Sequence, residues 1–182
     1  MEVPLAELWL PIVLSAVLVF IASALVWTVL PHHRTDWPSA PNGERVQELM
    51  KGAKPGQYIY PRMMDPAERK DPEAQRRYAE SSGFIIVKRP GLSMGKPMVL
   101  SLLFYLAVSV FVAYLAGISL GAGAPYLRVF QITGTAAILA YCGGLFPKAI
   151  WWGNTWSSTL KEAFDGVIYG LLTAGVFGWL WP

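Results

Sequence analysis

Long apolar runs and one polar segment alternate along this chain, and this pattern predicts a membrane protein. The first uncharged run, Leu8–Leu30, is 23 residues long. At about 1.5 Å per residue, a helix of that length crosses a hydrocarbon core of about 30 Å. Three further apolar runs follow the polar segment: Met98–Leu120, Val129–Phe146 and Leu160–Trp181. We expect each run to form a transmembrane helix, with Pro147 stopping the third.

The polar segment Pro31–Pro97 predicts a small domain of short mixed elements. Asp65 and Asp71 each precede a proline, an arrangement typical of a helix start. Gln57–Tyr60 and Phe84–Val87 are β-like runs bounded by turn residues. We expect the two runs to pair as a small sheet. An alternative lays the second run on the membrane surface, with its neighbouring cations near the headgroups.

These elements define the expected fold class, an all-α membrane protein with four transmembrane helices. A small mixed α/β insert separates the first helix from the second. The expected domains are residues 1–30, the first transmembrane helix; 31–97, the polar insert; and 98–182, a three-helix transmembrane bundle.

Composition agrees with this class. Hydrophobic residues make up 54% of the chain and charged residues only 15%, whereas soluble domains carry about 25% charged residues. The net charge of +3 does not indicate nucleic-acid binding, because the cations alternate with acids and form no basic run. The single cysteine, Cys142, lies in an apolar run and excludes an intramolecular disulfide.

The distribution of cations predicts the orientation. Twelve of the fifteen Lys and Arg residues lie in the insert. Lys148 and Lys161 lie in or beside the connection between the third and fourth helices, and the opposite side has only Arg128. Cation-rich loops remain in the cytoplasm. We therefore expect a multi-pass protein of a cell or inner membrane, with the insert cytoplasmic and both termini outside.

Small residues recur every four positions on the predicted helices, and residues four apart share a helix face. The second helix carries Ala113 and Gly117, and the fourth carries Gly166, Gly170, Ala174 and Gly178. Close approach through small residues drives helix packing in lipid. We favour packing within the chain over a contact between copies or with another membrane subunit. The first helix has only Ser15 and Ser23, so we expect it to lie apart or against a partner.

His32 and His33 follow the first helix with Asp36 nearby, and they are the only histidines in the chain. A metal site needs at least one further ligand and supporting hydrogen bonds, and adjacent residues of a regular element point in different directions. We therefore expect no metal site here and interpret the pair as interfacial polar residues.

Asp165 is the deepest ionisable residue in the predicted bundle. An acid within a membrane helix is a functional candidate by default. However, Thr159 and Glu162 form a capping-box pair, which puts Asp165 near the helix start with Lys161 one turn before it. We favour an interfacial acid paired with Lys161, whose loss would cost about 0.3–1 kcal/mol.

No spacing in this chain matches a catalytic, cofactor-binding or nucleotide-binding motif. We therefore expect no cofactor, and a protein that is not an enzyme. The favoured function is an accessory membrane protein that binds other subunits, or a second copy of itself, through the insert and the small-residue faces. The first alternative is a small oligomeric channel or transporter. A membrane enzyme acting on a lipid-like substrate is the weakest alternative.

Overall fold

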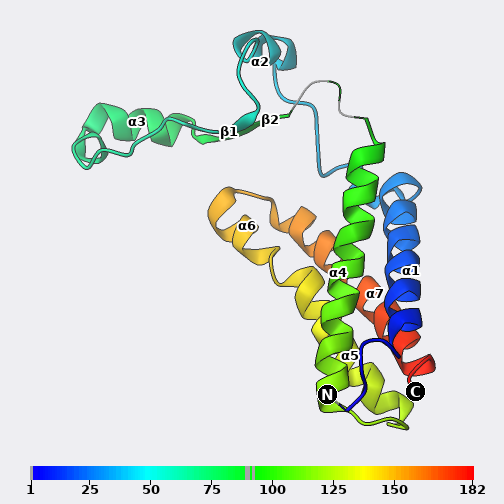
Figure 1. Cartoon of the computed structure of the whole chain (residues 1–182). Coiled ribbons are helices and arrows are strands. Elements are labelled where there is room, and N and C mark those ends of the chain that lie inside the picture. Colours follow the sequence, from blue (N-terminus) through cyan, green and yellow to red (C-terminus); the bar gives the residue numbers. More distant parts are fainter. Residues whose placement is uncertain (1, 89–90, 92) are drawn as a thin grey trace. The chain divides into compact units, whose positions relative to one another are not determined.

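The computed structural model describes residues 2–88, 91 and 93–182, and these residues are mostly helical (Figure 1). They form two compact units. The bundle unit contains Met1–Trp37, Ser93–Ile150 and Asn154–Pro182, and the insert unit contains Pro38–Leu92 and Trp151–Gly153. The seven residues after Leu30 thus belong with the helices, although their polarity resembles that of the insert.

The bundle unit is built from four long helices that lie side by side in Figure 1. They are α1 (Trp9–Thr28), α4 (Gly95–Ser119), α5 (Tyr126–Cys142) and α7 (Trp156–Trp179). A short 3₁₀ turn, η1 (Pro31–His33), follows α1, and a short helix, α6 (Phe146–Trp152), follows α5.

Among the described residues, three helical stretches are long and apolar enough to span a membrane. They are α1, α4 and the stretch Tyr126–Trp152 that joins α5 to α6. The fourth long helix, α7, has 24 residues but carries Lys161, Glu162 and Asp165 in its first half, and it is not among the three. The chain is therefore mostly helical, with three helices that could cross a membrane and a small two-stranded sheet.

Two predicted helix boundaries were wrong. Pro147 does not stop the third helix, because α5 already ends at Cys142 and Pro147 is the second residue of α6, where a missing N–H costs little. The last helix begins at Trp156, before the predicted start near Thr159. Its cap is Thr155, whose extended backbone lets the hydroxyl accept from the Ser158 N–H.

The small-residue face of α7 lies against α5 of the same chain. A Cβ atom added at Gly166 would meet the Cys142 sulfur at 2.6 Å, and one at Gly170 would collide with Ile138. Towards the end of the helix, a Cβ at Gly178 would lie 2.7 Å from the Tyr126 ring. These glycines let the two backbones approach closely, which is how helices gain packing contacts in lipid.

The weak small-residue pattern of α1 predicts that it lies apart or against a partner, but the helix packs within the bundle. It packs on α4 and α7, and Ser15 donates a 3.0 Å hydrogen bond to Ser109 of α4. Both hydroxyls are completely buried. Branched apolar side chains, rather than a run of glycines, make this contact, because Leu8 and Ile12 at the start of α1 share one core with the buried valines and alanines of α4.

Both ends of the chain lie at the same end of the bundle (Figure 1). The N–H groups of Glu2 and Val3 donate to the Gly117 carbonyl near the end of α4. The Gly123 N–H donates to the Pro182 carbonyl at 2.6 Å, and the Trp181 indole donates to Gly121. Consecutive long helices therefore alternate in direction, and η1 lies at the opposite end.

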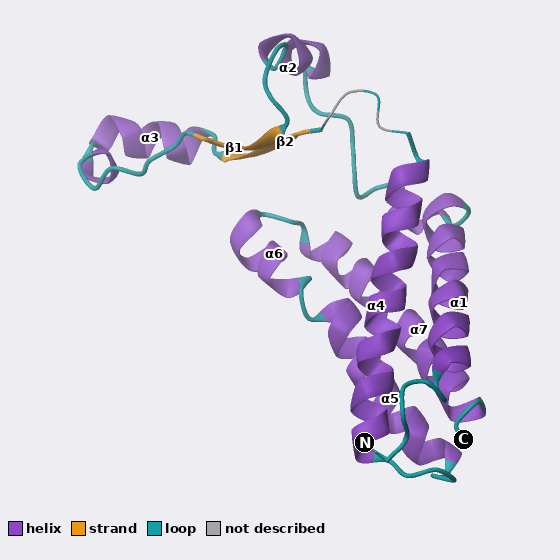
Figure 2. Cartoon of the chain, viewed as in Figure 1, coloured by secondary structure: helices purple, strands orange, loops and turns teal. Residues whose placement is uncertain are grey.

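The insert unit contains one antiparallel pair of strands, β1 (Gly56–Tyr60) and β2 (Gly83–Val87), shown in orange in Figure 2. The predicted pairing is thus confirmed, with Tyr58 opposite Ile85. The unit also holds α2 (Gly43–Leu49), η2 (Glu68–Lys70) and α3 (Pro72–Glu80). Asp71 caps α3 by accepting from the Glu73 N–H, whereas Asp65 starts no α-helix and accepts from the Ala67 N–H just before the 3₁₀ turn η2.

Candidate functional site: a histidine–aspartate cluster

A cluster of charged side chains lies where η1 meets α7, both within the bundle unit. Pro31 starts η1 with a fixed φ, and the tight 3₁₀ turn directs two consecutive imidazoles towards α7. Asp36 follows three residues after His33. On α7, Lys161 and Asp165 are four residues apart and share the face that meets η1.

His33 is the centre of this cluster. Its Nδ1 lies 2.6 Å from Asp36 Oδ2, and its Nε2 lies 2.6 Å from Asp165 Oδ2. The other oxygen of Asp165 lies 3.2 Å from His32 Nε2. One carboxylate thus contacts two imidazoles, and one imidazole contacts two carboxylates.

The spacing along α7 predicts that Lys161 pairs with Asp165, and this prediction is wrong. Its ammonium group donates to Asp36 Oδ1 at 2.6 Å, to the His32 carbonyl at 2.6 Å and to the Thr35 hydroxyl at 2.9 Å. Helix neighbours are not partners here because the loop after α1 supplies a nearer acceptor. Lys161 therefore fastens this loop to α7.

The cluster is buried, which makes it expensive to form. His33 is 6% exposed and Asp165 3% exposed, and the side chain of Asp36 is 2% exposed. Asp165 is the tenth residue of α7, so it is neither an exposed acid nor one in the first turn. Buried charges are retained only when other charges and hydrogen bonds offset the lost hydration.

The surroundings change the protonation of His33 and Asp36. Burial by itself would lower the pKa of His33, but hydrogen bonds to Asp36 and Asp165, together with their charges, raise it above the usual 6.5. Burial would also raise the pKa of Asp36, but Lys161 and His33 lower it. Without another cation, this arrangement favours a protonated His33 between two carboxylates.

Aromatic side chains enclose the cluster on its helix side. The Trp27 ring stacks on His33 with centroids 3.9 Å apart and an interplanar angle of 1°. Trp27 and Asp165 also line a cavity of about 150 Å³ with Tyr105, Tyr141 and Tyr169. The three tyrosine rings meet edge to face at about 6 Å. The buried hydroxyls of Tyr141 and Tyr169 have no hydrogen-bond partner among the described residues.

The same geometry meets both objections to a metal site at the histidines. Asp165, from α7, supplies the third ligand. The turn of η1 lets both rings reach it, because the side chains of a 3₁₀ turn do not alternate as those of a strand do. Among the described residues, His32, His33 and Asp165 form a group whose ligand atoms all lie within 4.8 Å of one another.

The structure brings together the four polar candidates identified in the sequence, which are His32, His33, Lys161 and Asp165. Sequence reasoning noted Asp36 near the histidines but did not identify it as the partner of His33 and Lys161, and it missed Trp27 as the ring that stacks on His33. The three-residue spacing from His33 to Asp36 was a usable signal, because it matches one helical turn. The small-residue positions lie elsewhere, along the contacts of α7 with α5 and of α4 with α1 and the N-terminal segment.

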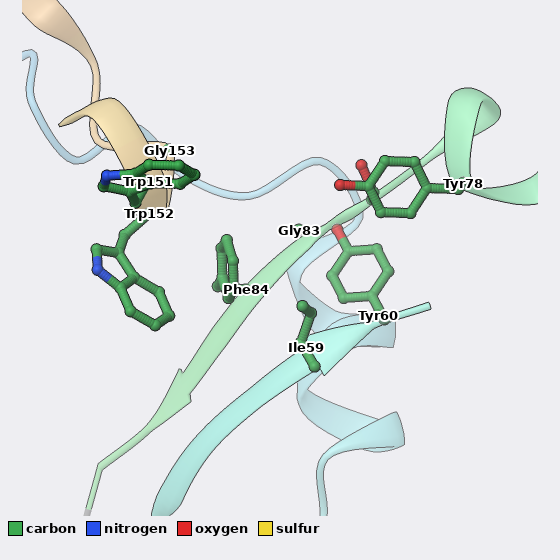
Figure 3. Close-up of a pocket in the computed structure, with 9 residues that line it drawn as sticks. Ile59, Tyr60, Tyr78, Gly83, Phe84, Trp151, Trp152 and Gly153 are labelled. Carbon is green, nitrogen blue, oxygen red and sulfur yellow. The ribbon is translucent and has the colours of Figure 1, made fainter. Parts of the chain in front are cut away.

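The insert unit has a separate pocket of about 400 Å³ (Figure 3). Figure 3 shows Tyr60 and Tyr78 at one side of it, and Trp152 at the other, with Phe84 between them. The Phe84 and Trp152 rings meet at 5.4 Å. None of its lining residues is charged, so this pocket offers aromatic surface and no group for acid–base chemistry.

Comparisons with protein-family models, with curated proteins and with solved structures found no match to this chain. The class is therefore defined by the fold and the site alone. It is a mostly helical protein with helices that could cross a membrane, and a buried histidine–aspartate cluster lies at one end of its bundle.

Proposed function

We propose that this protein is a four-span membrane protein that takes up a cation at the histidine–aspartate cluster, as a small transporter or channel does. The observation that carries the proposal is the burial of Asp165 in α7 between two imidazoles. This ranks the channel-or-transporter hypothesis above the accessory role that was favoured from the sequence.

The energetic cost of the cluster supports a functional role. Burying even a paired ion costs several kcal/mol of hydration, and well-packed apolar side chains often replace such pairs without loss of stability. Ionisable groups within membrane bundles are therefore rare and concentrate on ion pathways. Without another cation, the proton on His33 and the charge of Lys161 balance the two carboxylates, so an entering cation would take the place of that proton.

The packing of α7 supports four spans. Its 24 residues reach about 36 Å, enough for a hydrocarbon core. It runs beside α5 and α1 and buries ten residues. The charged cluster lies in its first half, which belongs at or near the membrane surface. With the cation-rich insert in the cytoplasm, the cluster lies at the cytoplasmic end and both termini lie outside.

A flux measurement tests the proposal. The full chain is reconstituted in liposomes, and entry of alkali, alkaline-earth and transition-metal cations is followed with ion-sensitive dyes. We expect one class of cation to enter, and we expect Asp165→Asn to abolish its entry while Glu48→Gln, at an exposed acid of α2, leaves it intact. Absence of flux for every cation, or equal flux through Asp165→Asn, would refute transport through this site.

A partner-binding role is the second candidate, and the aromatic pocket of the insert unit is the observation that favours it. Trp151 is 75% exposed and Trp152 57% exposed, and aromatic residues are enriched where subunits meet. On this hypothesis, Phe84→Ala weakens the association with a defined membrane subunit and leaves the melting temperature of the bundle unchanged. If Phe84→Ala and the unmodified chain associate equally with that subunit, the pocket is not the binding surface.

A further inference from the structure

We propose that His32, His33 and Asp165 bind one divalent transition-metal ion through two imidazole nitrogens and one carboxylate. The inference rests on the proposed cation-binding function and names the class of the cation. It is carried by the convergence of three ligand atoms from two segments far apart in sequence.

The distances fit a metal after small adjustments. Bonds from zinc to histidine and carboxylate ligands are about 2.0–2.2 Å, so tetrahedral ligand atoms lie about 3.4 Å apart. Here the two imidazoles lie 2.6 and 3.2 Å from the carboxylate oxygens, and all three ligand atoms lie within 4.8 Å. Side-chain rotations that move the ligand atoms by up to about 1 Å would bring them to metal-binding distances.

Asp36 and Lys161 complete the arrangement typical of a metal-bound histidine. Such a histidine usually donates its second N–H to a carboxylate, which fixes the tautomer and the ring plane. The Nδ1 of His33 meets Asp36, so the nitrogen left to bind a metal is Nε2, which lies 2.6 Å from the proposed ligand Asp165. Lys161 holds the other oxygen of Asp36, and Trp27 stacks on the ring. His33 is thus held before any ion arrives.

A hydrogen-bonded lock between η1 and α7 explains only part of this geometry. Asp36, His33, Lys161 and one oxygen of Asp165 are enough to fasten the loop. The lock does not need His32, yet its Nε2 also meets Asp165, on the second oxygen. Three donor atoms gathered within 4.8 Å of one another are what a metal site requires, and the lock does not need the third of them, from His32.

The donor set selects the kind of metal. Calcium and magnesium prefer six or more oxygen ligands, whereas two imidazoles and one carboxylate suit zinc, ferrous iron and cobalt. Three protein ligands leave at least one position for water or a substrate atom. The cavity beside Asp165, about 150 Å³ in volume and lined by Trp27 and the tyrosines, lies next to the cluster.

The test is metal binding to the purified full chain, carrying an affinity tag without histidine. The protein in detergent is stripped with EDTA and titrated with Co²⁺, whose visible absorption reports nitrogen–oxygen coordination, and Zn²⁺ is then used to displace the Co²⁺. We expect one ion per chain by elemental analysis, bound at micromolar concentrations or below and displaced by Zn²⁺ but not by Mg²⁺ or Ca²⁺.

Four variants separate coordination from structure. His32→Gln is expected to lose more than about 100-fold in affinity for Co²⁺ while the metal-free protein keeps its melting temperature. Asp165→Asn loses binding as well. Asp36→Asn retains one ion per chain with affinity reduced about 10–100-fold. Glu48→Gln, a control at an exposed acid of α2, binds as the unmodified chain does.

Two results would overturn the inference: no saturable binding of Co²⁺ or Zn²⁺, or His32→Gln binding Co²⁺ as tightly as the unmodified chain. His32→Gln decides the matter even where Asp165→Asn fails to fold. Flux of an alkali cation without binding of Co²⁺ or Zn²⁺ would refute the transition-metal site and leave the proposed cation transport standing. Binding of Co²⁺ or Zn²⁺ without flux of any cation would refute the proposed transport and leave the metal site standing.

Discussion

At the residue scale, His33 is the side chain on which the cluster depends most, because each of its ring nitrogens meets a carboxylate. The neighbouring groups are Asp36, Asp165, Lys161 and His32. Together the two carboxylates overcome the effect of burial and raise the pKa of His33 above 6.5. Protonation of this ring is therefore linked to the folding of the metal-free protein.

This linkage predicts that the metal-free protein loses stability as the pH rises. A group whose pKa is raised on folding contributes fully below its unfolded pKa, about 6.5 for histidine, and the contribution is lost as the pH passes the folded value. We expect the melting temperature in EDTA to fall as the pH rises above about 6.5. His33→Gln should flatten this slope. An equal slope in both proteins would contradict the linkage.

Asp165 should matter far more to stability than an acid at a helix start, for which the sequence suggested about 0.3–1 kcal/mol. It is 3% exposed and holds two imidazoles. Breaking a buried ion pair on one side costs about 3–5 kcal/mol. We expect Asp165→Asn to lower the unfolding free energy by about 3 kcal/mol near pH 6, measured by denaturant titration. A loss no larger than that of Glu162→Gln would show that burial adds nothing.

At the element scale, the contact of α7 with α5 depends on glycines at particular places, and two glycines of α7 make a matched test. A Cβ at Gly170 would collide with Ile138, whereas one at Gly175 meets no atom within 4 Å. Glycine also costs a helix about 0.5–1 kcal/mol relative to alanine.

We therefore expect opposite signs from the same substitution. Gly170→Ala should destabilise the bundle by about 1–3 kcal/mol, because the helices must move apart. Gly175→Ala should stabilise it by up to about 1 kcal/mol. Thermal unfolding in detergent measures both. Equal melting temperatures for the two variants would show that the close approach of α7 and α5 does not stabilise this contact.

At the scale of the whole molecule, the four long helices alternate in direction, so η1 and the two chain termini lie at opposite ends of the bundle. Together with the distribution of Lys and Arg in the sequence, this arrangement predicts which side of the membrane each end of the bundle faces. We predict that the loop between α4 and α5 lies on the same side of the membrane as the termini, and that the chain between α1 and α4 lies on the cytoplasmic side.

Labelling of single cysteines with an impermeant thiol reagent tests this orientation in intact cells. Ser39→Cys and Ser81→Cys in the insert should be protected until the membrane is opened. Ala122→Cys, in the loop between α4 and α5, should react at once. Ala122 is preferred to Gly123, whose φ of +75° disfavours a side chain. The buried Cys142 provides an unreactive background. The reverse pattern would invert the topology.

The apolar runs and the strand pair could be predicted from sequence because they depend on local patterns. Leu8–Leu30 anticipates α1 within two residues at each end, and the two β-like runs pair as expected. Helix ends were harder to predict. A cap is decided by one hydroxyl and the local backbone, and both Thr155 and Thr159 had the right chemistry.

The candidate site shows where sequence reasoning stops. Composition and spacing identified His32, His33, Lys161 and Asp165 as the polar residues of interest. They could not show that a lysine one turn before an aspartate would instead bind Asp36, 125 residues away in the chain. Such partners are set by how α1 and α7 pack, because side-chain hydrogen bonds act over about 3 Å and segments far apart in sequence meet only in the folded bundle. Hydrophobic periodicity is written locally in the sequence, whereas the convergence of two imidazoles on one buried carboxylate exists only in the tertiary structure.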